Sequence, residues 1–256
     1  MLVGAGDIGV CGVDGAERTA RLLDGIGGIV FTTGDHAYSN GTRDDFTNCY
    51  EPFWGRHTAR TRPTPGNHEY RTADAAAYFD YFGSNAGPWG LGYYSFTAGA
   101  WLVLSLNSNV PANGGSAQLA WLRDRLTTQP SQCVAVIWHH PLVSSGRYGR
   151  DATMRDVWRT LMEFKADLVL AGHDHAYERF ARLDDTGFPH PDGIRSFVVG
   201  TGGAPLYEFV SVQPGSERRL SEWGVLKLTL RSGAYDWEFI SVDGAAVRDT
   251  GTQACR

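Results

Sequence analysis

Residues 168–175 read Leu-Val-Leu-Ala-Gly-His-Asp-His, an apolar run that ends in a glycine and three polar residues able to bind a metal ion. The apolar run 168–171 predicts a short β-strand. The Gly-His-Asp-His segment would then lie at the carboxyl end of that strand, where α/β proteins place their ligands.

The same arrangement occurs at four other places in the chain. Strands are expected at 2–5, 29–33, 61–65 and 134–138. The residues that follow these four strands are, in the same order, Gly6-Asp7, Gly34-Asp35-His36-Ala37-Tyr38, Gly66-Asn67-His68-Glu69 and His139-His140-Pro141. Because the carboxyl ends of parallel strands open on one edge of a sheet, we expect these side chains to converge. A single Gly-Asp pair after a strand is typical of a turn or a helix cap. Five such strand ends together favour a metal-binding site.

Segments with helical spacing separate the predicted strands. Asp14 and Glu17 form an Asp-x-x-Glu cap before one such segment, and Gly25 closes it. Residues 117–126 and 152–164 carry large apolar side chains at helical spacing as well. Strands that alternate with helices predict an α/β core with largely parallel pairing.

The last third of the chain has a different pattern. Residues 226–230 and 235–239 alternate apolar with polar side chains around a Ser232-Gly233 turn, which predicts an antiparallel hairpin. No linker rich in Pro, Gly and Ser separates the two parts. We therefore expect one domain over residues 1–256 that contains two sheets.

Charge and hydropathy limit the possible partners. The 256 residues include 28 acidic and 23 basic side chains, which give a formal net charge of −5. A general nucleic-acid or acidic-membrane binder would instead need a basic surface. No apolar run approaches the roughly 18 residues that a membrane span needs. We expect a soluble protein with no stable nucleic-acid partner and no membrane association, and the sequence does not indicate its oligomeric state.

Four cysteines fit none of the Cys-x-x-Cys metal patterns: Cys11, Cys49, Cys133 and Cys255. Two disulfides in an oxidising compartment are favoured, with four buried free thiols as the alternative. Of three possible pairings we favour Cys11 with Cys49 and Cys133 with Cys255, because the first two follow strand ends expected side by side. No signal peptide is visible before the first predicted strand, so either it has been removed or the protein is cytosolic. The four cysteines favour the first alternative and a secreted location.

The types of side chain divide the expected metal site into two parts. Asp7, Asp35 and Tyr38 offer oxygen donors for a hard, highly charged cation, whereas Asn67, His139 and His173 suit a divalent iron, manganese or zinc ion. A carboxylate such as Asp35 can bridge two ions, and two ions about 3.5 to 4 Å apart suit in-line displacement at phosphorus. A tyrosine beside a trivalent iron would lose its proton.

These motifs resemble, in type and order, the calcineurin-like metallophosphoesterase superfamily and, within it, the purple acid phosphatases. Tyr38, three residues after Asp35, is the feature that marks the purple acid phosphatases. The resemblance implies a four-layer α/β/β/α sandwich of two mixed sheets flanked by helices, in a compact bacterial-type member. It also implies a ferric ion held by Asp7, Asp35, Tyr38 and His175, and a divalent ion (iron, zinc or manganese) held by Asp35, Asn67, His139 and His173.

The same resemblance implies a reaction and its catalytic residues. A small phosphomonoester would be hydrolysed by in-line attack of a metal-bound hydroxide, with Asp35 bridging the metals and His68 stabilising the phosphate or protonating the leaving oxygen. Asn67 and His68 would contact the substrate. Large plant members place further histidines where this chain has residues 141–148, which lack histidine. Arg147 and Tyr148 are the candidates to replace them, with an exposed glycine-flanked loop as the alternative.

Two other functions fit the same residues. A phosphodiesterase or nucleotide hydrolase would use the same pair of metals, because the surrounding loops choose the ester. A phosphate-binding or iron-carrying protein without catalysis is less favoured, since the full set of expected ligands and His68 is present.

Overall fold

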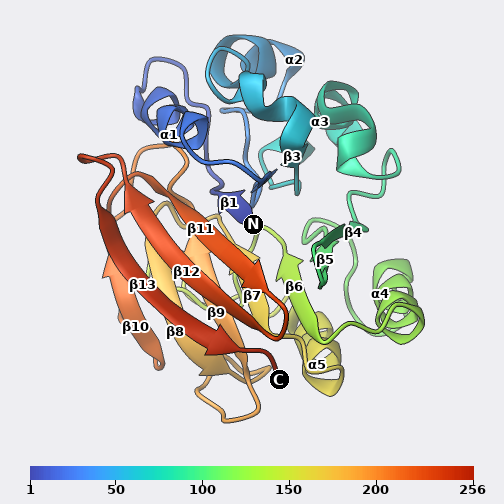
Figure 1. Ribbon diagram of the computed structural model, residues 1–256. Helices are drawn as coiled ribbons and strands as arrows, with labels where there is room; N and C mark the ends of the chain where they lie inside the picture. The colour runs from blue at the N-terminus through green and yellow to red at the C-terminus, as the bar shows by residue number, and fades with distance from the viewer.

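The computed structural model describes all 256 residues and contains two mixed β-sheets with helices around them (Figure 1). The first sheet has the strand order β13-β12-β11-β1-β2-β3. Its strands are β1 (Leu2–Gly4), β2 (Ile29–Phe31), β3 (Thr61–Arg62), β11 (Gly224–Arg231), β12 (Ala234–Ser241) and β13 (Val247–Ala254). Strands β1, β2 and β3 are parallel, and β11, β12 and β13 extend the sheet with antiparallel pairings.

The second sheet has the order β10-β8-β9-β7-β6-β5-β4. Its strands are β4 (Tyr94–Ala98), β5 (Trp101–Ser105), β6 (Cys133–Ile137), β7 (Leu168–Ala171), β8 (Tyr177–Leu183), β9 (Ile194–Val199) and β10 (Ser216–Leu220). Its interior strands β5, β6, β7 and β9 are parallel, while β4, β8 and β10 pair antiparallel. The predicted class, two mixed sheets flanked by helices, is confirmed.

The helices gather in two groups, with α1, α2 and α3 on one side of the molecule and α4 and α5 on another (Figure 1). The α-helices are α1 (Gly15–Asp24), α2 (Arg43–Asp45), α3 (Ala76–Phe82), α4 (Ala117–Thr128) and α5 (Arg155–Glu163). Short 3-10 or π turns are η1 (Phe46–Tyr50), η2 (Trp54–Arg60), η3 (Glu69–Arg71), η4 (Ala73–Ala75) and η5 (Gly83–Ala86). No helix is both long enough and apolar enough to cross a lipid bilayer.

Several local predictions are confirmed, and two differ in detail. Asp14 is the N-cap residue of α1, but its side chain makes no capping hydrogen bond because its backbone (φ −82°, ψ −4°) already has helical angles. The strand predicted at 61–65 is only two residues long, since Pro63 and Pro65 have no N–H to donate to a neighbouring strand. The predicted hairpin is present as β11 and β12 around Ser232-Gly233.

Alternation along β6 shows how the layers are held together. Cys133, Ala135 and Ile137 belong to the core that the two sheets share, while Val134 and Val136 pack into a second core with α4 and α5. Both faces of β6 are therefore buried, which explains its unbroken apolar sequence.

Both favoured disulfides are present, and no cysteine is free. Cys11 bonds to Cys49, joining the loop after β1 to η1. Cys133 bonds to Cys255 across 122 residues, so the start of β6 in one sheet is tied to the end of β13 in the other.

Candidate metal centre

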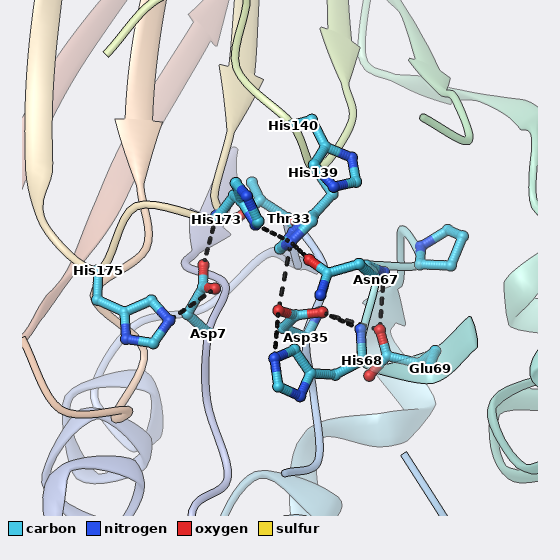
Figure 2. Close-up of polar contacts among 12 residues, drawn as sticks. Asp7, Thr33, Asp35, Asn67, His68, Glu69, His139, His140, His173 and His175 are labelled. Atoms are coloured by element: carbon cyan, nitrogen blue, oxygen red, sulfur yellow. Dashed lines mark hydrogen bonds and ion pairs between the residues drawn. The ribbon is translucent and has the colours of Figure 1, made fainter. Parts of the chain in front are cut away.

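The five predicted strand ends meet at one place, as expected from the parallel strands that carry them (Figure 2). Asp7 and Asp35 follow β1 and β2, which pair in parallel with Gly4 opposite Phe31. His139 and His173 follow β6 and β7, which are parallel neighbours in the second sheet. The site therefore lies where the carboxyl ends of both sheets meet.

Four donor atoms form the first group. The hydroxyl oxygen of Tyr38 lies 3.0 Å from Asp7 Oδ1, 3.2 Å from Asp35 Oδ2 and 3.1 Å from His175 Nε2. His175 Nε2 is also 3.4 Å from Asp7 Oδ1. All four residues are buried, with Asp7 fully enclosed and Asp35 only 2% exposed.

A second group converges on the other side of Asp35. His139 Nε2 lies 3.0 Å from Asn67 Oδ1, 3.1 Å from His173 Nδ1 and 3.3 Å from Asp35 Oδ2. The same carboxylate oxygen, Asp35 Oδ2, thus belongs to both groups. In Figure 2 Asp35 stands between Asp7 on one side and Asn67 on the other.

The spacing within both groups suits bound cations. Atoms about 2.1 Å from one ion lie about 3.0 Å apart in an octahedron and about 3.4 Å apart in a tetrahedron. The seven separations given above all lie between 3.0 and 3.4 Å. The donor set, two carboxylates, a phenol, an amide and three imidazoles, therefore fits two metal ions that share Asp35.

Hydrogen bonds on the far side of two imidazoles direct their lone pairs inward. Nδ1 of His139 donates to the carbonyl of Thr33 at 2.7 Å, and Nδ1 of His175 donates to the carbonyl of Pro205 at 2.7 Å. In each neutral ring the Nε2 atom then has a free lone pair that faces the carboxylates. This orientation is the one that a metal-binding histidine needs.

The buried carboxylates and imidazoles shift one another's pKa values. Burial alone would lower the pKa of His139, but the carboxylate of Asp35 outweighs it and raises that pKa to about 9. Burial and the neighbouring His139 lower the pKa of His173 to about 2, and burial with the nearby carboxylates of Asp35 and Asp7 raises the pKa of Tyr38. The site therefore concentrates negative charge and lone pairs that are only partly neutralised by protons.

Three of the candidate ligands have an unusual backbone conformation. Asp7, Asp35 and His173 have left-handed φ angles of 58°, 51° and 71°. Such angles cost energy in residues other than glycine and cluster at functional sites. Gly66 is required here because a Cβ atom would lie 2.2 Å from Asp35 Oδ1, and a Cβ on Gly34 would lie 2.6 Å from His139 Nδ1.

His68 lies next to the oxygen that both groups share. Its Nε2 is 3.8 Å from Asp35 Oδ2, its Nδ1 contacts the carbonyl of Ser39, and its ring packs against Tyr38 at 4.3 Å between centroids. Its backbone N–H donates to Asp35 Oδ1 at 2.8 Å. The imidazole therefore faces the predicted metal pair from the side.

Two buried carboxylates support the site without belonging to either group. Glu69 accepts the backbone N–H groups of Asp35, His36 and Gly66 at 3.0, 2.8 and 2.7 Å. Asp174 accepts the backbone N–H groups of Arg147 and Tyr148 at 2.7 and 3.3 Å. Glu69 thus joins the loops after β2 and β3, and Asp174 holds the loop that carries the predicted substrate residues.

The structure places Arg147 and Tyr148 at the rim of the centre. The ring of Tyr148 stacks on His173 at 3.9 Å, and the Arg147 guanidinium lies over Tyr207, 5.5 Å from the ring centre. Tyr207 in turn stacks on His175 at 4.0 Å. Tyr207 was not predicted, because it lies in a segment without helix or strand and has no periodic signal.

Ser108 is a second residue that the sequence analysis missed. It follows β5, another parallel strand of the second sheet, and its hydroxyl lies 2.8 Å from Nδ1 of His140. The signal was present, since Trp101–Ser105 is an apolar run followed by Asn107-Ser108-Asn109. Burial and the adjacent His139 lower the pKa of His140 to about 4, so this ring is neutral near pH 7.

Comparison with known proteins gives a family and several relatives. Residues 2–177 match the family model described as calcineurin-like phosphoesterase. An uncharacterized protein of Mycobacterium tuberculosis strain H37Rv is 32% identical over 231 residues, covering 76% of this chain and 42% of that protein. Purple acid phosphatase 15 of Arabidopsis thaliana is 26% identical over 235 residues, covering 77% of this chain and 44% of that protein. The chain thus spans less than half the length of these two relatives.

Among solved structures, a purple acid phosphatase from seeds of yellow lupin (Lupinus luteus) has a similar fold. It superposes with a TM-score of 0.79 at 20% sequence identity, over 99% of this chain and 53% of that chain. At this identity the likeness shows a shared fold.

Proposed function

The chain belongs to the calcineurin-like phosphoesterase family, and we propose that it is a dinuclear-metal phosphatase of the purple acid phosphatase type that hydrolyses phosphomonoesters. One observation carries the proposal: the two groups of donor atoms share the single oxygen Asp35 Oδ2, at 3.2 Å from Tyr38 and 3.3 Å from His139. A carboxylate shared in this way suits two ions held side by side.

Each ion would be held by one group of residues. Asp7, Asp35, Tyr38 and His175 would hold a ferric ion, and Asp35, Asn67, His139 and His173 would hold a divalent iron, zinc or manganese ion. When bound, such a pair supplies Lewis-acid activation of the phosphate ester and of an attacking water molecule.

The charge of the ligands explains how an acidic chain would bind phosphate. Asp7, Asp35 and the phenolate form of Tyr38 contribute three negative charges against five positive charges of a trivalent and a divalent ion. The local surplus of two positive charges would attract a phosphate dianion although the chain carries a net charge of −5. A broad basic surface is therefore unnecessary.

His68 is the proposed proton donor to the leaving oxygen. The Ser39 carbonyl next to Nδ1 fixes a proton on that atom, so Nε2, which faces Asp35, carries a proton only in the imidazolium form. A proton delivered from Nε2 to the departing alkoxide oxygen would form the alcohol and leave the neutral ring in the tautomer that Ser39 favours. Asn67, Arg147 and Tyr148 are the further residues proposed to contact the substrate.

The wider setting is also a proposal. We propose that residues 1–256 act as one catalytic domain and that its substrates are small phosphate esters. The two disulfides favour an oxidising compartment, which supports a secreted location.

Initial rates on a phosphomonoester and on a phosphodiester, measured with metal-reconstituted protein, test the proposed activity. We expect the monoester to be the better substrate by kcat/KM. A clear preference for the diester would instead assign a phosphodiesterase, and two bound metals without hydrolysis of either ester would contradict the enzymatic assignment.

A further inference from the structure

A buried serine holds the imidazole of His140, the residue after the predicted ligand His139. The hydroxyl of Ser108, which is only 4% exposed, lies 2.8 Å from His140 Nδ1. The same oxygen accepts the backbone N–H of His140 at 3.1 Å. The loop after β5 therefore holds this imidazole through two contacts.

The serine hydroxyl favours one of the two neutral tautomers of His140. The hydroxyl of Ser108 has one proton to donate, and His140 Nδ1 is the one acceptor within hydrogen-bonding distance of it. A bond from the hydroxyl to Nδ1 uses that proton and leaves Nε2 as the protonated nitrogen of the neutral ring, whereas the reverse bond, from Nδ1–H to the hydroxyl oxygen, would leave the hydroxyl proton without an acceptor in the protein. Nε2 has no hydrogen-bond partner within the protein and is not fully buried. It can therefore bind a molecule from outside.

The ring of His140 lies beside the second group of donor atoms. Its centroid is 4.5 Å from that of His173 and 4.9 Å from that of His139. One ring nitrogen of His140 lies within 4.8 Å of a ring nitrogen of His139 and of one of His173. A nitrogen that carries a proton cannot bind a metal ion through a lone pair, so His140 is suited to donate a hydrogen bond to an anion there.

We propose that His140 is a phosphate-binding residue whose Nε2–H donates to an oxygen of a phosphate group held at the second group of donor atoms, with Ser108 as its positioning residue. The inference rests on the proposed function, because the metals would hold the phosphate. The loop of residues 141–148 contains no histidine. His140 would supply an imidazole donor to the site in its place.

The affinity for inorganic phosphate, measured by calorimetry on metal-loaded protein, tests this role without requiring turnover. His140→Ala should weaken phosphate binding by roughly tenfold or more, the usual effect of losing a hydrogen bond to a charged group. His140→Gln, which retains an N–H donor, should recover part of the affinity, and Ser108→Ala should cause a smaller loss. His190→Ala removes an exposed histidine of the β8–β9 hairpin and should change nothing.

Metal content and kinetics separate substrate binding from other roles. The variants of His140 should retain both metal ions per chain, and KM for a phosphomonoester should rise more than kcat falls. Nitrogen NMR of labelled histidine should show a protonated Nε2 in the wild type, and Ser108→Ala should weaken that preference.

Three results would overturn the inference. Loss of a metal ion in His140→Ala would make His140 a ligand, and unchanged phosphate affinity in both His140 variants would make it a structural residue. If the wild type binds phosphate with two metals but hydrolyses no ester, the proposed function fails while the role of His140 stands. A wild type that binds no phosphate contradicts both.

Discussion

The carboxylate of Glu69 accepts the backbone N–H of Asp35 at 3.0 Å, so a residue outside both donor groups fixes the residue that they share. The same oxygen of Glu69 accepts the N–H of Gly66 at 2.7 Å, and its other oxygen accepts the N–H of His36 at 2.8 Å. Glu69 is completely buried. It therefore sets the distance between the loop that carries Asp35 and the loop that carries Asn67.

Glu69→Gln should destabilise the protein and weaken metal binding. The amide NH₂ group would face at least one backbone N–H donor, and we expect the free energy of unfolding to fall by about 2 to 4 kcal/mol. Chemical denaturation of the metal-free protein measures this loss. Glu163→Gln, at a half-exposed residue paired with Arg123, is the matched control and should cost less than about 1 kcal/mol. Equal losses in the two variants would show that Glu69 has no special role.

Tyr38→Phe should abolish the visible absorption of the oxidised iron-loaded protein. The Tyr38 hydroxyl is 3.0 Å from Asp7 Oδ1 and 3.2 Å from Asp35 Oδ2, where a ferric ion would convert it to a phenolate. Tyr50→Phe is the control, since the buried hydroxyl of Tyr50 has no hydrogen-bond partner and its loss should leave the spectrum unchanged. A colourless iron-loaded wild type would disprove the ferric assignment.

Arg147→Ala should raise KM for a phosphomonoester by roughly tenfold, because a hydrogen bond between charged groups is lost. The guanidinium lies over Tyr207 at the rim and has no carboxylate partner. Arg150→Ala is the control. The guanidinium of Arg150 belongs to the same loop but packs on Phe188, so the KM of this variant should match that of the wild type. If the kinetics of Arg147→Ala are unchanged, Arg147 does not contact the substrate.

Asp249 should make stability fall in acid. It accepts hydrogen bonds from Tyr177 and Arg179, both at 2.7 Å. Burial raises the pKa of Asp249, but the bonds from Arg179 and Tyr177 outweigh it and hold that pKa below its ordinary value of 3.8. Because the folded state binds the proton more weakly than the unfolded state, the ionised carboxylate stabilises the fold above about pH 4 and this stabilisation is lost at lower pH.

The test of Asp249 compares unfolding free energies across pH. Asp249→Asn should cost about 1 to 3 kcal/mol at pH 7, and the difference from the wild type should shrink below pH 4. Asp236→Asn, at a more exposed pair with Arg231, serves as the control. A difference that stays constant from pH 7 to pH 3 would contradict the role of the ionised carboxylate.

The convergence of the polar strand ends could be predicted from the sequence because its signals are local. Asp7 and Asp35 each follow an apolar run and a glycine, and parallel pairing of the two strands then brings them together. The same reasoning applied to Trp101–Ser105 would have found Ser108, which we did not predict.

Other features depend on contacts that no local pattern encodes. Tyr207 reaches His175 only because a segment without regular structure packs back on the site, with its N–H donating to the His175 carbonyl at 2.9 Å. Likewise, Glu69 acts through the backbone of residues in another loop. Tertiary packing decides which loop returns to which candidate ligand. The sequence therefore located the converging side chains better than the residues that hold them in place.

Anomalous X-ray diffraction from crystals of the metal-loaded protein, recorded at the absorption edges of iron and of the divalent metal, tests the central claim most directly. We predict two peaks per chain, about 3.5 to 4 Å apart, on either side of Asp35 Oδ2. A single peak, or two peaks that do not share Asp35, would contradict the dinuclear centre.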